Sequence, residues 1–366
     1  MNMMNLNRIN HLQQEMTKKG IDLMMLQSRS NVFYASGFDA DPHERLIAVL
    51  LPADGDPFTV CPGMEKKQIS ALFDGAVYGY DDSTDPWTLL MQIIQEKKLP
   101  HETIALEETM AWARVQQWEQ LAPGAALVSA DPILLEARGK KTADERKAME
   151  EAAALADFGV ETGISALKEG VTEMEVIAAV EFALKKEGVR EMSFSTMVLF
   201  GGGAGDPHGN PGNRKLAAGD GVLFDLGVRW KGYTSDITRT VFFRHADEQQ
   251  RRIYETVQKA QEAAVRACRT GTRLGDIDTA ARNVIEQAGW GDYFPHRIGH
   301  GIGIDVHEAP SMSSNNNDKL EAGLAFTIEP GIYLPDTLGV RIEDDIIMEE
   351  AGPVLLTAYP KTLQIV

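Results

Sequence analysis

Two stretches of the chain, LAAGDGVLFDLG at residues 216–227 and LEAGLAFTIEPG at residues 320–331, decide the fold because they repeat one another. Aligned without gaps, they share the leading leucine, an apolar run and the final glycine, and they place Asp225 opposite Glu329. Further upstream, EGVTEMEVIAAVEFALKKEG and TGTRLGDIDTAARNVIEQAG are helical in pattern and carry glycine pairs at one shared spacing. Self-similarity of this kind indicates an internal duplication. Each half then contributes one carboxylate at the same position.

Each repeated stretch opens a predicted β-hairpin. GVLFDLGVRW and YTSDITRTVFF read as strands, and pairing them about Trp230 and Lys231 places Asp225 opposite Asp236. The second hairpin turns at residues 335–337, which places Glu329 opposite Glu343.

Opposed carboxylates in these hairpins need a counter-charge. Directly opposed residues have Cβ atoms about 4.5–5.5 Å apart, and like charges there repel. The neighbours of these acids are apolar, so the charges are predicted to be desolvated, which is costly for an unpaired anion. A lone acid in a strand is more often solvent-facing, but the repeat and both hairpins together favour four carboxylates around two divalent cations.

The acidic cluster at residues 343–345 is ambiguous by itself. Strand alternation places Arg341, Glu343 and Asp345 on one face. Of the two acids on that face, the hairpin register selects Glu343 as the metal ligand.

Three of the eight histidines fall in HRIGHGIGIDVHEAP, residues 296–310. His300 stands between two glycines, and His307 has a counterpart in His208 of DPHGNPG. A lone histidine beside glycine is more often a turn or core residue, but imidazole added to carboxylates suits Mn, Co, Fe or Zn better than Mg or Ca. We therefore expect His300 at the metals and His208 and His307 beside them, and leave His296 open as structural or substrate-facing.

Length, composition and net charge limit the classes of protein to which this chain can belong. At 366 residues, with 43% hydrophobic and 25% charged residues, the chain is of globular type and long enough for two domains. A net charge of −18 gives no basic surface, which argues against nucleic-acid and membrane partners. The start of the chain is too polar for a signal peptide, and no apolar run is long enough for a membrane span, so a cytoplasmic location is expected. Cys61 and Cys268 are expected to be inert packing residues.

The pattern of predicted secondary structure changes near Lys140. Residues 1–139 alternate helical and strand-like segments, an α/β pattern, whereas an alanine-rich helical run opens the region 140–366. We therefore predict two domains, 1–139 and 140–366.

The motifs D-x10-D, GHGIGxxVHE, IEPG and VRIED resemble the pita-bread metallopeptidase family, which includes methionine aminopeptidase, aminopeptidase P and prolidase. SNVFYASGF, residues 30–38, resembles the creatinase-type N-terminal domain of the proline-specific members. The resemblance implies an α/β (α+β) fold class, in which a creatinase-like α/β domain precedes a pseudo-two-fold pita-bread catalytic domain. It also implies a homodimer.

The resemblance assigns roles residue by residue. Two divalent ions per subunit, with Mn expected and Co, Fe or Zn as alternatives, would be held by a set of five ligands: Asp225, Asp236, His300, Glu329 and Glu343. Glu329 would also take and return the proton of the attacking water. His208 and His307 would bind the substrate carbonyl and its oxyanion. Arg341 would steady the acid Glu343 or bind the substrate carboxylate.

The implied activity is metal-dependent hydrolysis of the Xaa-Pro bond in dipeptides or short peptides. The modest chain length and the spacing of Glu329 and Glu343 resemble the short prolidases, which cleave dipeptides, more than aminopeptidase P, which remains the alternative. A creatinase-like C–N hydrolase and a non-catalytic binding module are less favoured, because both readings predict loss of metal ligands and all five ligands are present.

Overall fold

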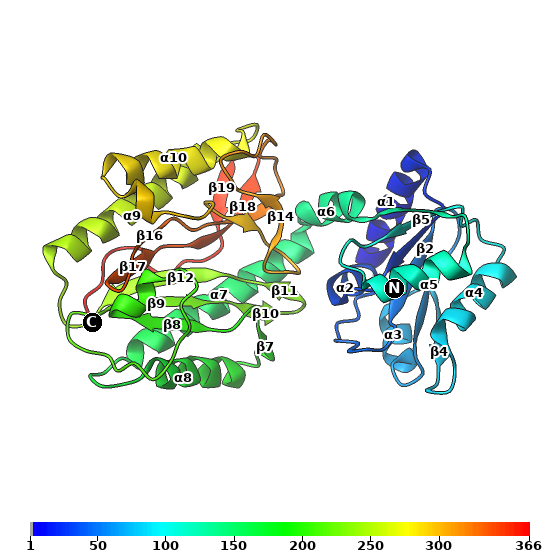
Figure 1. Ribbon diagram of the computed structural model, residues 1–366, viewed down its shortest axis with the longest axis horizontal. Helices are drawn as coiled ribbons and strands as arrows, with labels where there is room; N and C mark the ends of the chain where they lie inside the picture. Colours follow the sequence, from blue (N-terminus) through cyan, green and yellow to red (C-terminus); the bar gives the residue numbers. More distant parts are fainter. Residues whose placement is uncertain (1–2) are drawn as a thin grey trace. The chain divides into compact units, whose positions relative to one another are not determined.

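The computed structural model describes residues 3–366 and divides into two compact units. The first extends to Arg138 and the second spans Gly139–Val366 (Figure 1).

The N-terminal unit is built on one mixed six-stranded sheet in the order β4-β3-β2-β1-β5-β6. Its strands are β1 (Leu23–Leu26), β2 (Ala48–Pro52), β3 (Phe58–Pro62), β4 (Ala76–Tyr80), β5 (Thr103–Leu106) and β6 (Ala126–Ser129). The helices are α1 (Met3–Lys19), α2 (Arg29–Ser36), α3 (Lys66–Leu72), α4 (Pro86–Glu96), α5 (Trp112–Leu121) and α6 (Asp131–Gly139). The central strands β1, β2 and β3 are buried along their whole length, which explains why they read as continuous apolar runs in the sequence.

The C-terminal unit contains two pairs of helices that flank its strands (Figure 1). The first pair is α7 (Ala143–Ser165) and α8 (Glu173–Lys186), and the second is α9 (Glu248–Ala267) and α10 (Leu274–Gln287). Capping boxes begin α7, α8 and α9. The apolar stripe of α9 packs into a core with α10 and the strands of the second half.

The structure confirms the internal repeat. α8 and α10 are both 14 residues long. The glycines that flank them, Gly170 and Gly188 in one half and Gly271 and Gly289 in the other, all have positive φ angles. Each helix is preceded by a matching bridge, Thr172 to Lys215 and Arg273 to Lys319. The two halves therefore share one local fold, as the pseudo-two-fold prediction requires.

The strands of the two halves form corresponding sheets. In the first half, β8 (Met197–Phe200), β9 (Gly221–Leu226) and β12 (Ile237–Phe242) form an antiparallel sheet in the order β12-β9-β8. In the second, the order is β14-β13-β15-β18-β19, from β13 (His300–Gly301), β14 (Glu308–Ser311), β15 (Ala325–Ile328), β18 (Asp344–Glu349) and β19 (Gly352–Leu355). Shorter elements complete the unit: β7 (Glu191–Met192), β10 (Val228–Trp230), β11 (Tyr233–Thr234), β16 (Gly331–Leu334), β17 (Leu338–Arg341) and the 3-10 turns η1 (Gly201–Gly205) and η2 (Gly291–Tyr293).

One predicted hairpin register is right and the other is wrong. In the second hairpin Ile328 pairs with Asp344 and Gly331 with Arg341, so the register that aligns Glu329 with Glu343 continues on both sides of them. In the first, Asp225 lies opposite Thr238 and not opposite Asp236. The cause is the turn, in which Lys231 and Gly232 both have positive φ angles, as a two-residue turn of type I′ requires. The centre of the turn therefore lies one residue later than predicted, and the partner of Asp225 moves by two residues, from Asp236 to Thr238.

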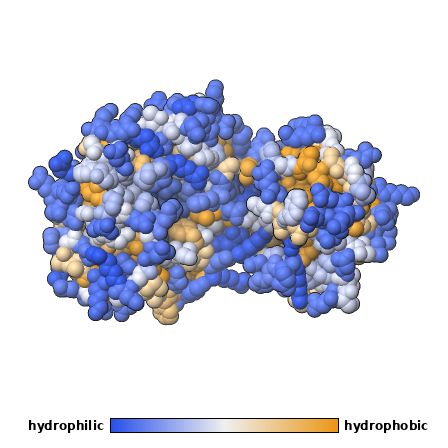
Figure 2. Space-filling view, viewed as in Figure 1, coloured by the Kyte–Doolittle hydropathy of each residue, from blue (hydrophilic) through white to orange (hydrophobic). Residues whose placement is uncertain are grey.

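Hydrophilic residues cover most of the face of the molecule shown in Figure 2. Among residues 3–366, no helix has the length and apolar character needed to cross a membrane. Cys61 and Cys268 are free and buried, which agrees with their expected role in packing.

Candidate metal centre and active site

The five predicted metal ligands line one cavity of about 410 Å³ in the C-terminal unit. Each stands at or next to a strand end, where side chains from several strands can converge. The lining residues are Phe194, Met197, Pro207, His208, Asp225, Asp236, His296, Arg297, His300, Val306, His307, Glu329, Arg341 and Glu343. The structure thus brings together every residue that the sequence assigned to the site.

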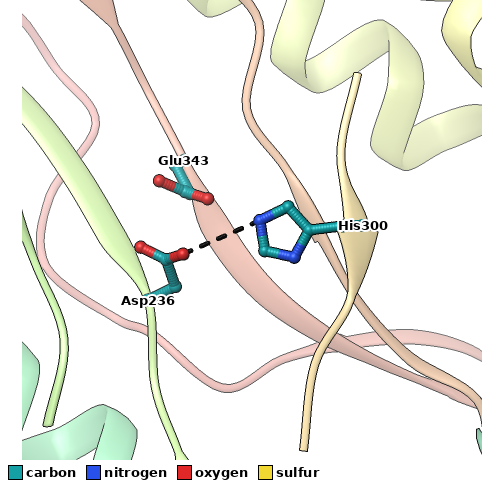
Figure 3. Close-up of side chains that lie close together, drawn as sticks. All are labelled: Asp236, His300 and Glu343. Atoms are coloured by element: carbon teal, nitrogen blue, oxygen red, sulfur yellow. Dashed lines mark ion pairs between the residues drawn. The ribbon is translucent and has the colours of Figure 1, made fainter. Parts of the chain in front are cut away.

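Asp236, His300 and Glu343 form the centre of this cavity and point toward one another (Figure 3). Each offers a ligand atom within 4.8 Å of the ligand atoms of the other two. Nε2 of His300 lies 3.8 Å from Oδ2 of Asp236 and 3.6 Å from Oε1 of Glu329. All three central residues are buried, so a cation bound here would be largely shielded from solvent.

The glycines on either side of His300 are required by close packing of the backbone. A Cβ atom on Gly299 would collide with the carbonyl oxygen of Thr327, and one on Gly301 would collide with that of Ala309. The Oγ1 of Thr327 also accepts a hydrogen bond of 3.2 Å from the backbone N–H of His300. The two glycines therefore allow the backbones of the neighbouring segments to pack closely on both sides of His300.

Asp225 belongs to a buried polar network organised by Arg341. Nη2 of Arg341 lies 2.5 Å from Oδ2 of Asp225, and Nη1 donates to the Tyr333 hydroxyl at 2.9 Å. Nε donates to Oγ1 of Thr238 at 2.9 Å, and that hydroxyl donates to Oε2 of Glu343 at 2.7 Å. Arg341 thus steadies Asp225 directly and Glu343 through Thr238. These contacts favour the steadying role over the proposed contact with substrate.

Burial raises the pKa of four acids of the centre. The pKa of Asp225 is raised, and the pKa values of Asp236 and Glu329 are raised well above their ordinary range. The pKa of Glu343 is raised to about 7. Repulsion from neighbouring carboxylates adds to the shift in Asp236, Glu329 and Glu343. Burial also lowers the pKa of His300 to about 3. A neutral imidazole with a free lone pair is the form that binds metals.

Unpartnered oxygen atoms show that the residues fit a metal. Among the side chains that the structure describes, Oδ1 of Asp225, Oδ1 of Asp236 and Oε1 of Glu343 are buried without a hydrogen-bond partner. Buried carboxylate oxygens are normally satisfied, and an unsatisfied one costs free energy. Divalent cations would satisfy all three oxygens and remove the repulsion between the acids.

Three further histidines, His208, His296 and His307, line the cavity around this centre. The ring of His307 packs against that of His300 at a centroid distance of 4.1 Å. His208 is exposed on a loop and reaches the same cavity. His296 is hydrogen-bonded through Nε2 to the Tyr333 hydroxyl at 2.9 Å, and burial lowers its pKa to about 4. It therefore extends the network of Arg341 to the cavity wall.

Several residues of the site were not identified from the sequence. Thr238 would have been found with the correct hairpin register, because it is the strand partner of Asp225. Arg297, which lines the cavity and donates to Oγ of Ser311 at 3.1 Å, lies between His296 and His300 in the histidine-rich segment and could have been noticed there. Phe194 and Met197 carry no comparable signal in the sequence, because they reach the cavity only through tertiary folding.

The comparisons identify the class of protein. Residues 147–350 match metallopeptidase family M24, and residues 8–139 match the creatinase/prolidase N-terminal domain. The chain belongs to metallopeptidase family M24, which confirms the resemblance, and membership implies divalent metal ions.

Individual relatives are similar along the whole chain. “Putative dipeptidase YkvY” of Bacillus subtilis (strain 168) is 47% identical over 98% of this chain and 99% of its own length. The crystal structure of a prolidase from Thermococcus sibiricus superposes with a TM-score of 0.92 at 35% identity, covering 98% of both chains. An Xaa-Pro dipeptidase from Bacillus anthracis gives a TM-score of 0.92 at 30% identity, covering 99% of this chain and 100% of its own.

The raised pKa values predict that metal binding stabilises the protein more as pH rises. An acid whose pKa is raised in the folded state contributes stability that is complete below its unfolded pKa and is lost as pH rises through the folded value, about 7 for Glu343. Bound metal displaces those protons, so the loss is confined to metal-stripped protein. We expect the difference in Tm between protein with Mn and protein with chelator to grow from pH 5 to pH 8.

The measurement is thermal unfolding at fixed free-metal concentration, with Glu343→Gln as the control. That variant loses one of the titrating acids, so its Tm difference should rise less steeply with pH. A Tm difference that stays constant across this range would contradict the prediction.

Proposed function

We propose that the protein is a dinuclear-metal-dependent Xaa-Pro dipeptidase, with Mn as the expected metal. The observation that carries the proposal is the convergence of Asp225, Asp236, His300, Glu329 and Glu343 in one cavity beside His208 and His307. The full-length similarity to a prolidase and to an Xaa-Pro dipeptidase supports the choice of substrate. A homodimer and a cytoplasmic location stay predictions.

The two ions, held by these five ligands, would supply a Lewis acid for the scissile carbonyl and lower the pKa of the attacking water. Glu329 accepts the proton of that water and returns it to the proline nitrogen when the C–N bond breaks. As in the hydrolysis of any peptide bond, the nitrogen must gain a proton in order to leave, and here it leaves as the secondary amine of proline.

His208 and His307 bind the substrate carbonyl through their imidazole N–H groups. Donors aimed at the carbonyl oxygen stabilise the charge that develops on it during attack. Arg341 keeps Asp225 and Thr238 in place and acts as a support of the metal ligands.

The test is cleavage of matched peptides by metal-stripped protein with and without added Mn or Co. The substrates are an Xaa-Pro dipeptide, the tripeptide Xaa-Pro-Xaa and an Xaa-Ala dipeptide, and the released N-terminal residue is measured. We expect metal-dependent cleavage of the Xaa-Pro dipeptide alone.

Each of the other outcomes would change the proposed function. Cleavage of the tripeptide would make the protein an Xaa-Pro aminopeptidase, and equal cleavage of Xaa-Ala would exclude proline specificity. No cleavage by protein that binds two metal ions would retain the metal centre and reject the substrate.

A further inference from the structure

We propose that Glu173 is a positioning residue for His208, because its carboxylate holds both ends of the loop that carries this histidine. The inference rests on the proposed function, in which His208 binds substrate. Glu173 lies in the first turn of α8, outside the metal centre, and is only 3% exposed.

Residues 206–212, the part of the loop that carries His208, are all exposed or half-buried, whereas the preceding turn η1 is packed, with Gly201, Ala204 and Gly205 buried. After β8 the chain reads GGGAGDPHGNPG, residues 201–212, with small residues at most positions, and the first five of these residues form η1. Two hydrogen bonds to Asp206 hold the chain close to His208. The backbone N–H of His208 donates to Oδ1 of Asp206 at 3.0 Å, and the backbone N–H of Gly209 donates to the carbonyl oxygen of Asp206 at 3.0 Å. His208 itself is exposed.

Two pockets border this loop. One is the metal-centre cavity of about 410 Å³, and the other is a pocket of about 690 Å³ that Glu173 also lines. Pro207, directly before His208, lines both. Because residues 206–212 contain no buried position, the placement of His208 depends on how the chain is fixed at Phe200 before η1 and at Gly212 after His208.

Glu173 fixes both ends. Oε1 accepts a hydrogen bond of 2.8 Å from the backbone N–H of Phe200, where β8 ends. Oε2 accepts one of 2.7 Å from the N–H of Gly212, where the loop returns. Only a carboxylate offers two acceptor oxygens here, since glutamine would direct a donor NH₂ group at one of the two N–H groups. The helix N-terminus also favours the negative charge at this position.

The test is a double-mutant cycle that combines Glu173→Gln with His208→Ala. A displacement of a substrate-binding group by about 1 Å can cost about 100-fold, so we expect Glu173→Gln alone to lower kcat/KM by about 10- to 100-fold. In the His208→Ala background, the same change should have almost no further effect, because the group that it positions is already gone.

Glu175→Gln is the matched control. It removes the same charge from the same helix end, but Glu175 is hydrogen-bonded to Thr172 and not to the loop. We expect kcat/KM to stay within about twofold of the wild type. Metal binding by calorimetry should be unchanged in Glu173→Gln, which separates loop positioning from loss of the fold. If that variant does not fold, Glu173→Asp keeps both acceptor oxygens and takes its place in the cycle.

The outcomes separate the two proposals. Losses that simply add in the double variant, or a wild-type kcat/KM in Glu173→Gln, overturn the positioning role of Glu173 and leave the proposed function intact. A wild-type kcat/KM in His208→Ala overturns the substrate role of His208, and the inference with it.

Discussion

Replacing Glu329 by glutamine is expected to lower kcat by about 10²- to 10⁴-fold, the range that general acid–base catalysis supplies. Glutamine keeps the size of the side chain and one oxygen that can face the metal centre, but it cannot carry a proton. Oε1 of Glu329 lies 3.6 Å from Nε2 of His300, and burial raises the pKa of the carboxyl. The measurement is kcat on an Xaa-Pro dipeptide at saturating metal, with metal content determined in the same samples.

Glu321→Gln provides the control for this substitution. Glu321 pairs with Lys140 on the surface, where both side chains are more than half exposed, so its loss should leave kcat unchanged. If Glu329→Gln bound both metal ions and retained more than about a tenth of kcat, another group would have to carry the proton. Loss of one metal ion would instead show that the carboxylate acts mainly as a ligand.

The convergence of the candidate metal ligands could be predicted because each ligand is marked by a recognisable pattern in the sequence. Asp225 and Glu329 occupy equivalent places in a repeat that is visible in the sequence, and the structure confirms the repeat in equal helices and matching bridges. His300 is marked by its flanking glycines. The structure adds the reason for those glycines, which is the approach of two neighbouring backbones.

The first hairpin shows where such reasoning fails. The position of Asp236 depends on a turn in which Lys231, a residue without special turn preference, adopts a positive φ angle. No pattern of apolar residues reveals that choice. The error changed the strand partner of Asp225, but Asp236 still reaches the cavity, because it lies between β11 and β12 and points inward with His300 (Figure 3).

The supporting contacts could not be predicted, because they join residues far apart in the chain. Arg341 and Asp225 are 116 residues apart, and Glu173 and Gly212 are 39 apart. Whether a buried arginine faces a substrate or an acid of the protein depends on tertiary packing. The sequence indicates only that Arg341 shares a strand face with Glu343.

A second network of this kind, centred on Arg239, leads to the largest stability effect that we expect. Arg239 is 1% exposed and lies 2.6 Å from Oδ1 of Asp344. It also donates to the carbonyl oxygens of Tyr359 and Glu343. Removing one partner of a buried ion pair costs about 3–5 kcal/mol, so Arg239→Met should lower the free energy of unfolding of the C-terminal unit by that amount. Denaturant unfolding of metal-stripped protein measures this loss.

Arg266→Met is the matched control, because Arg266 forms an exposed pair with Glu262 within α9, worth about 0.3–0.5 kcal/mol. Equal losses in the two variants would mean that the buried network adds no net stability. Asp344 keeps Lys361 at 2.6 Å and Gln261 at 2.7 Å, so Arg239→Met should still fold. Because Arg239 contacts the backbone of Glu343, the variant should also bind metal more weakly, whereas Arg266→Met should not. The same arginine would then link the stability of the unit to the geometry of its metal centre.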